Sequence, residues 1–191
     1  MKKRICSLVC VLALTLGILS LSALGAPTTT VYLLATNDKM CDLPGGLLPV
    51  AVSGTIYVPY LVFDKATTGV DLGVYYGLKQ EQGTILSLYS INGNLTFRVI
   101  MGLCEDGQDN PMNFRALPRN NIPYVPAAAV CDFFGLQYSF LPTTDRGTLI
   151  RITSSSDTLS DALFLASARS SMLERYNNIL QAREPAPSAP P

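Results

Sequence analysis

The amino-acid sequence predicts an α+β protein that consists mainly of antiparallel β-sheet. Two stretches, 56–89 and 121–152, have the same order of an extended segment, a short helix and a hairpin. After residue 157, apolar residues recur at the spacing of an amphipathic helix. Two copies are too few for a solenoid. We therefore expect one pseudo-symmetric domain of two half-repeats at 26–153, followed by a C-terminal helix within 154–183.

The second copy carries the stronger signals. Pro123 and Pro126 predict an extended segment, because each proline fixes its own φ and keeps the preceding residue out of the α region. Residues 127–134 have helical spacing, and Gly135 follows where a left-handed residue usually ends a helix. Apolar and polar side chains then alternate, as in half-buried strands. The predicted strand, turn and strand span 136–140, 143–147 and 148–152.

The first copy begins at Tyr57-Val58-Pro59, which recurs as Tyr124-Val125-Pro126, 67 positions later (124 − 57). A short helix is predicted at 60–65, ended by Thr67-Thr68-Gly69. The strands predicted after it, separated by a turn at 80–83, span 70–76 and 84–89.

Outside the copies, strands are predicted at 31–36, 47–52 and 95–101. Asn92-Gly93 precedes the last of these and predicts a type I′ hairpin turn, which needs positive φ at both central residues. Residues 102–111 are polar and acidic, and we expect them to form a loop.

The C-terminal helix is expected to begin after Asp157 or Thr158, because Thr158-Leu159-Ser160-Asp161 fits a capping box. It should run to about Ala182 and either pack on the domain or pair with a partner. Its apolar positions include Leu159, Leu163, Phe164, Ala166, Met172, Leu173, Tyr176, Ile179 and Leu180. Residues 184–191 hold four prolines in their last seven positions, which predicts a Pro-rich linker or tail.

Residues 1–25 have the pattern of a signal peptide. A basic start, Lys2-Lys3-Arg4, precedes an apolar run at 5–21, and Ala23-Leu24-Gly25 has the small residues that signal peptidase needs. We expect cleavage after Gly25 and a secreted or cell-envelope location. An uncleaved membrane anchor is the alternative, since the apolar run at 5–21 is close to the ~20 residues that a spanning helix needs.

Composition excludes several classes of function. Lys plus Arg and Asp plus Glu both number 14. Without the three basic residues of 1–25, 11 basic and 14 acidic residues remain, a net charge of −3, so no nucleic-acid partner is expected. The chain has no histidine, which excludes Ser-His and Cys-His nucleophile pairs and removes the commonest metal ligand.

Three cysteines follow the signal segment: Cys41, Cys104 and Cys131. An odd number at wide spacing does not form a disulfide framework. One bridge with one free thiol and three buried thiols are both open at this stage. With no CxxC and no histidine, neither a metal site nor a redox cofactor is predicted.

The two aromatic-Val-Pro segments, each followed by a helix and a hairpin, resemble the copper amine oxidase-like N-terminal (stalk) domain. The matching positions in the second half are Tyr124-Val125-Pro126, Phe134-Gly135, Tyr138 and Thr148-Leu149-Ile150-Arg151-Ile152, and in the first half Tyr57-Val58-Pro59. The arginine that commonly follows Val-Pro in this family is absent from both copies. The resemblance implies a non-catalytic module of exported, envelope-associated bacterial proteins. It implies no copper, since that metal belongs to the oxidases' catalytic domain.

The sequence thus favours a non-catalytic envelope module that binds to the cell wall or serves as a spacer there. Its partner would be a wall polysaccharide or another envelope protein. Tyr57 and Tyr124 are the candidate ligand contacts, by stacking on sugar rings; half-buried strand positions are the alternative. Glu105, Asp106 and Asp109 offer a second hypothesis, a wall-glycan hydrolase, although a solvated acidic loop or a weak Ca²⁺ loop also fits them. A scaffold that dimerises through the C-terminal helix is a third.

Overall fold

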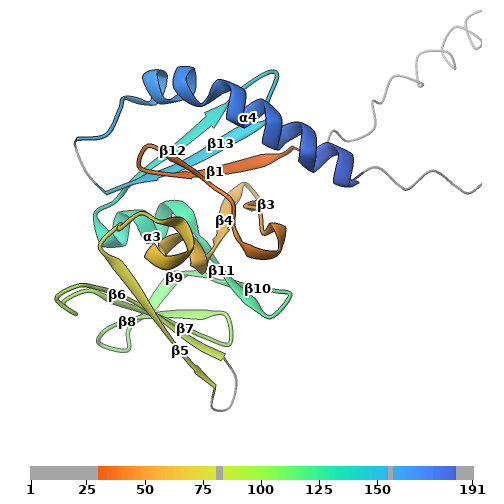
Figure 1. Ribbon diagram of the computed structural model, residues 1–191. Coiled ribbons are helices and arrows are strands. Elements are labelled where there is room, and N and C mark those ends of the chain that lie inside the picture. The colour runs from red at the N-terminus through yellow and green to blue at the C-terminus, as the bar shows by residue number, and fades with distance from the viewer. Residues whose placement is uncertain (1–29, 81–83, 155–156, 184–191) are drawn as a thin grey trace, which may run out of the picture. The chain divides into compact units, whose positions relative to one another are not determined.

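The protein is an α+β, sheet-dominated fold with a C-terminal helix, as the sequence predicts. The computed structural model describes residues 30–80, 84–154 and 157–183 (Figure 1). The predicted signal peptide, the tail at 184–191 and most of the predicted turn at 80–83 lie outside the described residues. Within them, no helix combines the length and the apolar character needed to span a membrane.

The strands are β1 (Tyr32–Thr36), β2 (Lys39–Cys41), β3 (Val50–Val52), β4 (Thr55–Pro59), β5 (Val74–Gln80), β6 (Thr84–Ser90), β7 (Thr96–Ile100), β8 (Leu103–Asp106), β9 (Pro111–Arg115), β10 (Leu117–Arg119), β11 (Ile122–Pro126), β12 (Gln137–Pro142) and β13 (Thr148–Thr153). The helices are η2 (Pro44–Gly46), η3 (Tyr60–Phe63), α2 (Lys65–Thr68), α3 (Ala127–Phe134) and α4 (Asp161–Arg183). The strands form sheet A (β12-β13-β1-β2), sheet B (β10-β11-β4-β3) and sheet C (β5-β6-β7-β8-β9).

Sheet B joins the two copies of the predicted unit. Its central strands β4 and β11 are antiparallel, with Tyr57 opposite Pro126, Val58 opposite Val125, and Pro59 opposite Tyr124. The two aromatic-Val-Pro segments therefore pair with each other around the fully buried valines. A helix follows each segment, but the hairpins enter different sheets: β5-β6 belongs to sheet C and β12-β13 to sheet A.

Sheet A is covered on both faces. On one face, Leu34, Ile150 and Ile152 join the main core together with α3 and sheets B and C. On the other face, Leu33 and Leu149 pack against α4, which lies along this sheet in Figure 1. All six residues of β13 are buried, so the half-buried strand predicted at 148–152 is wrong. Arg151, the charged residue of β13, contacts Asp161 and Phe164 of α4 and so lies under the helix and not in solvent.

Several local predictions are corrected. The expected acidic loop at 102–111 contains strand β8 and the first residue of β9, and the strand expected at 70–76 begins at Val74. In the hairpin between β6 and β7, Gly93 has positive φ but Asn92 does not, so the turn is not type I′. Both central residues of the β10–β11 turn, Asn120 and Asn121, have positive φ, with values of 51° and 61°. The type I′ geometry is therefore found there.

Helix α4 begins later than predicted. Its first turn is capped by Ser160, whose carbonyl accepts from the Phe164 N–H at 2.9 Å and whose hydroxyl accepts from the Leu163 N–H at 3.4 Å. The sequence favoured Asp157 or Thr158 as the cap. The start is shifted because Asp161, the first helical residue, is held by an arginine of β13.

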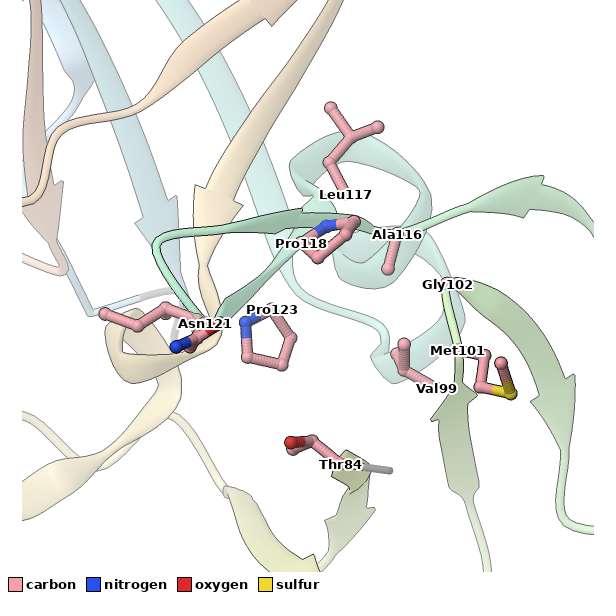
Figure 2. A pocket seen from close by; sticks show the side chains of 10 residues that line it. Thr84, Val99, Met101, Gly102, Ala116, Leu117, Pro118, Asn121 and Pro123 are labelled. Carbon is pink, nitrogen blue, oxygen red and sulfur yellow. The ribbon is translucent and has the colours of Figure 1, made fainter. Parts of the chain in front are cut away.

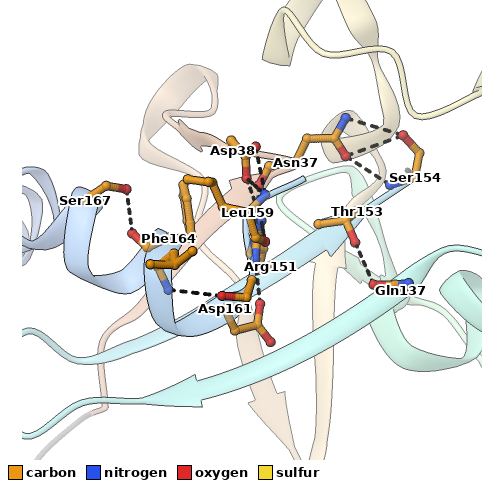
Figure 3. Close-up of polar contacts among 12 residues, drawn as sticks. Asn37, Asp38, Gln137, Arg151, Thr153, Ser154, Leu159, Asp161, Phe164 and Ser167 are labelled. Atoms are coloured by element: carbon orange, nitrogen blue, oxygen red, sulfur yellow. Dashed lines mark hydrogen bonds and ion pairs between the residues drawn. The ribbon is translucent and has the colours of Figure 1, made fainter. Parts of the chain in front are cut away.

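That arginine, Arg151, is only 2% exposed and connects three segments (Figure 3). It donates to carboxylate oxygens of Asp38 and Asp161, both at 2.6 Å, and to the carbonyl oxygens of Asn37 at 2.9 Å and Leu159 at 2.8 Å. Its guanidinium carbon lies 4.5 Å from the centre of the Phe164 ring. We call this group of residues the Arg151 clamp. It fixes the start of α4 to the β1–β2 turn and to the centre of sheet A.

Candidate functional site

An open cleft with aromatic walls lies on the surface of the described residues. It has a volume of about 760 Å³ and lies between the start of α3, the β3–β4 turn, β9 and β12. Its aromatic side chains are Tyr32, Phe114, Tyr138 and Phe140. We call it the aromatic cleft. Five segments far apart in the sequence build it, since Tyr32 of β1 also lines the cleft.

Strand β12 supplies two of the four rings. Tyr138 and Phe140 are two residues apart and so point to the same face of the sheet. Because β12 is an edge strand of sheet A, no neighbouring strand covers its outer side, and Phe140 is 47% exposed. Tyr138 is more enclosed, and burial, with smaller effects from Cys131 and Tyr32, raises its pKa. Its phenol therefore stays neutral at physiological pH and offers a hydrogen-bond donor and acceptor.

The remaining lining of the aromatic cleft is small or uncharged. Ala51, Gly54 and Ala128 leave room, whereas Thr55 and Asn113 add polar groups that are exposed to solvent. None of the described residues that line the cleft carries a charge. An uncharged ligand with flat apolar faces and peripheral hydroxyls matches such walls.

A second, smaller cavity of about 390 Å³ lies between the β7–β8 turn and the β10–β11 hairpin (Figure 2). Its walls are mainly apolar, from Val99, Ala116 and Pro123, with polar groups from Thr84 and Asn121. Met101 at its rim is 83% exposed and has a φ of 50°. The cavity is suited to an apolar side chain and offers few groups for chemistry.

The two tyrosines predicted as ligand contacts do not form a site together. Tyr124 is 2% exposed and burial raises its pKa, so neither face of its ring is open to a ligand. Tyr57 is half-buried, opposite Pro126 in sheet B. Neither ring lines the aromatic cleft or the smaller cavity. Of the two roles that the sequence offered for Tyr124, a half-buried strand position is nearer to the structure than a ligand contact. The residue is even more enclosed than that, since it is fully buried.

The predicted acidic loop is a hairpin whose carboxylates have partners. Glu105 lies opposite Arg98 across the strands, with 3.6 Å between a carboxylate oxygen and a guanidinium nitrogen, and Asp109 pairs with the same arginine. Asp106 accepts from the side chain of Asn110 at 3.0 Å and from its N–H at 2.9 Å, which lowers the pKa of Asp106. A glycosidase acid needs a raised pKa, and Asp106 has the opposite.

All three cysteines that follow the signal segment are free and buried. Burial raises the pKa of Cys104 to about 11 and that of Cys131 to about 12. The Cys41 sulfur lies 3.0 Å from the Thr36 hydroxyl, and burial raises its pKa as well. Of the two possibilities that the sequence left open, the structure contains three buried thiols.

No protein-family model, curated protein or solved structure matches this chain. Within 30–80, 84–154 and 157–183, no three Cys, Asp or Glu side chains are grouped as metal ligands. The sequence reasoning missed all four aromatic residues of the cleft as site residues: Tyr32, Phe114, Tyr138 and Phe140. Only the spacing of Tyr138 and Phe140, two aromatics on one side of a predicted strand, signalled part of the aromatic cleft.

Proposed function

We propose that the protein is a non-catalytic, exported module of the cell envelope that binds an uncharged stretch of cell-wall glycan in the aromatic cleft. The observation that carries this proposal is the set of aromatic rings around an open, uncharged hollow. The sequence features of a signal peptide and the resemblance to the stalk domain support the export and the lack of catalysis.

The chemistry of the cleft favours a sugar over an ion or a nucleotide. Sugar rings present apolar C–H faces, which stack on Phe140 and Tyr138, and hydroxyls, which can bond to the phenol and to Asn113. Phosphate-rich ligands need cationic side chains, which the described lining lacks. The net charge of −3 after the signal segment also opposes strongly anionic polymers.

Binding to purified cell wall and to soluble wall oligosaccharides tests the proposal. Phe140→Ala should weaken binding about two- to thirteenfold, since an aromatic contact contributes about 0.5–1.5 kcal/mol. Tyr89→Ala is the matched control, because Tyr89 is also exposed, at 37%, but lies on sheet C outside the cleft. Equal loss in both variants, or no loss in Phe140→Ala, would reject the cleft as the binding site.

The hydrolase hypothesis predicts instead that the protein cleaves wall glycan and needs the carboxylates of the β8–β9 hairpin to do so. Changing Glu105, Asp106 and Asp109 together to their amides should leave wall binding unchanged under our proposal. If the unaltered protein cleaves wall glycan and the triple variant does not, the module is an enzyme and the proposal is wrong.

A further inference from the structure

Helix α4 has a second apolar face that the domain does not cover. Phe164, Ala168 and Met172 are buried against sheet A. Leu163, Leu173 and Leu180 are 60%, 40% and 36% exposed. Together with intervening small and polar residues they form a stripe with alternating steps of three and four: Leu163, Ala166, Ser170, Leu173, Asn177 and Leu180. This is the a/d spacing of a coiled coil, with Leu163, Ser170 and Asn177 at a positions and Ala166, Leu173 and Leu180 at d positions. We call it the α4 stripe.

We propose that the α4 stripe binds the same stripe of a second copy of this chain, with the two helices parallel. In a parallel pair, identical residues face each other, so that Asn177 meets Asn177, Ser170 meets Ser170 and leucines meet leucines. An antiparallel pair would place Asn177 against Ala166 and Ser170 against Leu173. Each polar group would then be buried without a hydrogen-bonding partner, which is costly.

The charges beside the stripe favour the same arrangement. Arg169 directly precedes an a position and Glu174 directly follows a d position. These are the g and e positions, which pair across a parallel dimer from one heptad to the next. Arg169 of each copy would therefore face Glu174 of the other. Arg169 is 69% exposed, and its present contact with Asp145, at 3.4 Å, is an exposed ion pair that holds it only weakly.

The domain leaves this side of α4 open. The buried residues of α4 occupy the b, c and f positions, which point away from a coiled-coil partner. Figure 1 shows α4 along the outer side of sheet A. Two contacts with the domain fix the position of α4. One is the Arg151 clamp, and the other is Arg175, which donates to both carboxylate oxygens of Asp42 at 2.7 and 2.6 Å. Because the helix is ordered before it meets a partner, dimerisation avoids the entropic cost of folding it.

The spacing of 17 residues from Leu163 to Leu180 corresponds to only about 26 Å of helix, so the dimer should be weak. Sedimentation equilibrium over the micromolar to millimolar range should show a reversible monomer–dimer equilibrium for the chain without its signal peptide. Leu173→Glu should abolish it, whereas Leu78→Glu should not, although Leu78, on sheet C, is equally exposed at 43%. Far-ultraviolet circular dichroism confirms that both variants are folded.

A charge exchange and a cysteine variant test the orientation. Arg169→Glu and Glu174→Arg should each weaken the dimer, and the double exchange should restore it. Asn177→Cys should form a disulfide between copies under mild oxidation, because the two a positions face each other in a parallel pair.

A monomer at every concentration overturns the proposal, even if it binds phosphatidylglycerol vesicles, which would assign the stripe to lipid. A dimer that survives Leu173→Glu, or that forms no disulfide through Asn177→Cys, overturns it too.

Discussion

The Arg151 clamp provides the sharpest test of how the fold is held together. Arg151→Met keeps an unbranched stem of similar length against the Phe164 ring but removes four hydrogen bonds. Two of these bonds join the guanidinium to the carboxylates of Asp38 and Asp161, and two satisfy backbone carbonyls. The substitution thus leaves two carboxylates without their cation at the point where α4 begins.

The expected cost follows from the burial of the partners. Removing one member of a buried ion pair costs about 3–5 kcal/mol, because the remaining charge is left uncompensated. The side chains of Asp38 and Asp161 are 38% and 40% exposed, so water can partly replace the arginine. We therefore expect a loss at the low end, about 3 kcal/mol. For a domain of this size, such a loss lowers Tm by roughly 6–12 °C.

Urea unfolding measures this difference, and an unchanged m-value would show that the unfolded state is the same. Arg169→Met is the control: its ion pair with Asp145 is exposed, so its loss should cost at most about 1 kcal/mol. Hydrogen exchange should also be faster in the first turns of α4 in Arg151→Met, but not in the control. A cost below about 1 kcal/mol for Arg151→Met, or one equal to that of the control, would refute the clamp.

Three further predictions concern pH, backbone geometry and thiol chemistry. Hydrogen bonds from Arg175 lower the pKa of Asp42 from 3.8, so this carboxyl contributes stability above that value and loses it as the pH falls through its lower folded pKa. Asp42→Asn should remove this part of the acid-unfolding profile. Gly147→Ala should cost about 2 kcal/mol more than Gly93→Ala, by urea unfolding. Both glycines have positive φ. A Cβ at Gly147 would lie 2.5 Å from the carbonyl oxygen of Val31, whereas a Cβ at Gly93 would have no atom within 4 Å. Cys131, with a pKa of about 12, should react with thiol reagents only after unfolding; rapid reaction in the native state would contradict its burial.

The sequence predicted best where local signals and the fold agree. Residues 127–134 form α3 as expected, because Pro126 precedes the helix and Gly135 ends it with a φ of 68°. The burial of β13 was not predictable from its own alternation, since α4, a later segment, covers its second face. The strand β8 was missed because its carboxylates look solvated, whereas Glu105 is paired with Arg98 across the sheet.

The candidate site was less accessible to sequence reasoning than the fold. The aromatic cleft depends on Tyr32, Phe114, Tyr138 and Phe140, which come from strands of two different sheets. No local pattern connects these residues. The conspicuous Tyr124 was chosen because it recurs in both copies, but recurrence here marks the pairing of β4 with β11, which buries it.

The parallel pairing of β1 with β13 also affects how the chain folds during synthesis. Ribosomes release the N-terminal side first, and β1 then has only the short β2 beside it, since β13 follows after more than half the chain length. Parallel contacts between such distant segments form slowly. Sheet A therefore cannot close until nearly all of the domain has been made, whereas the strands of sheets B and C are already complete at residue 126.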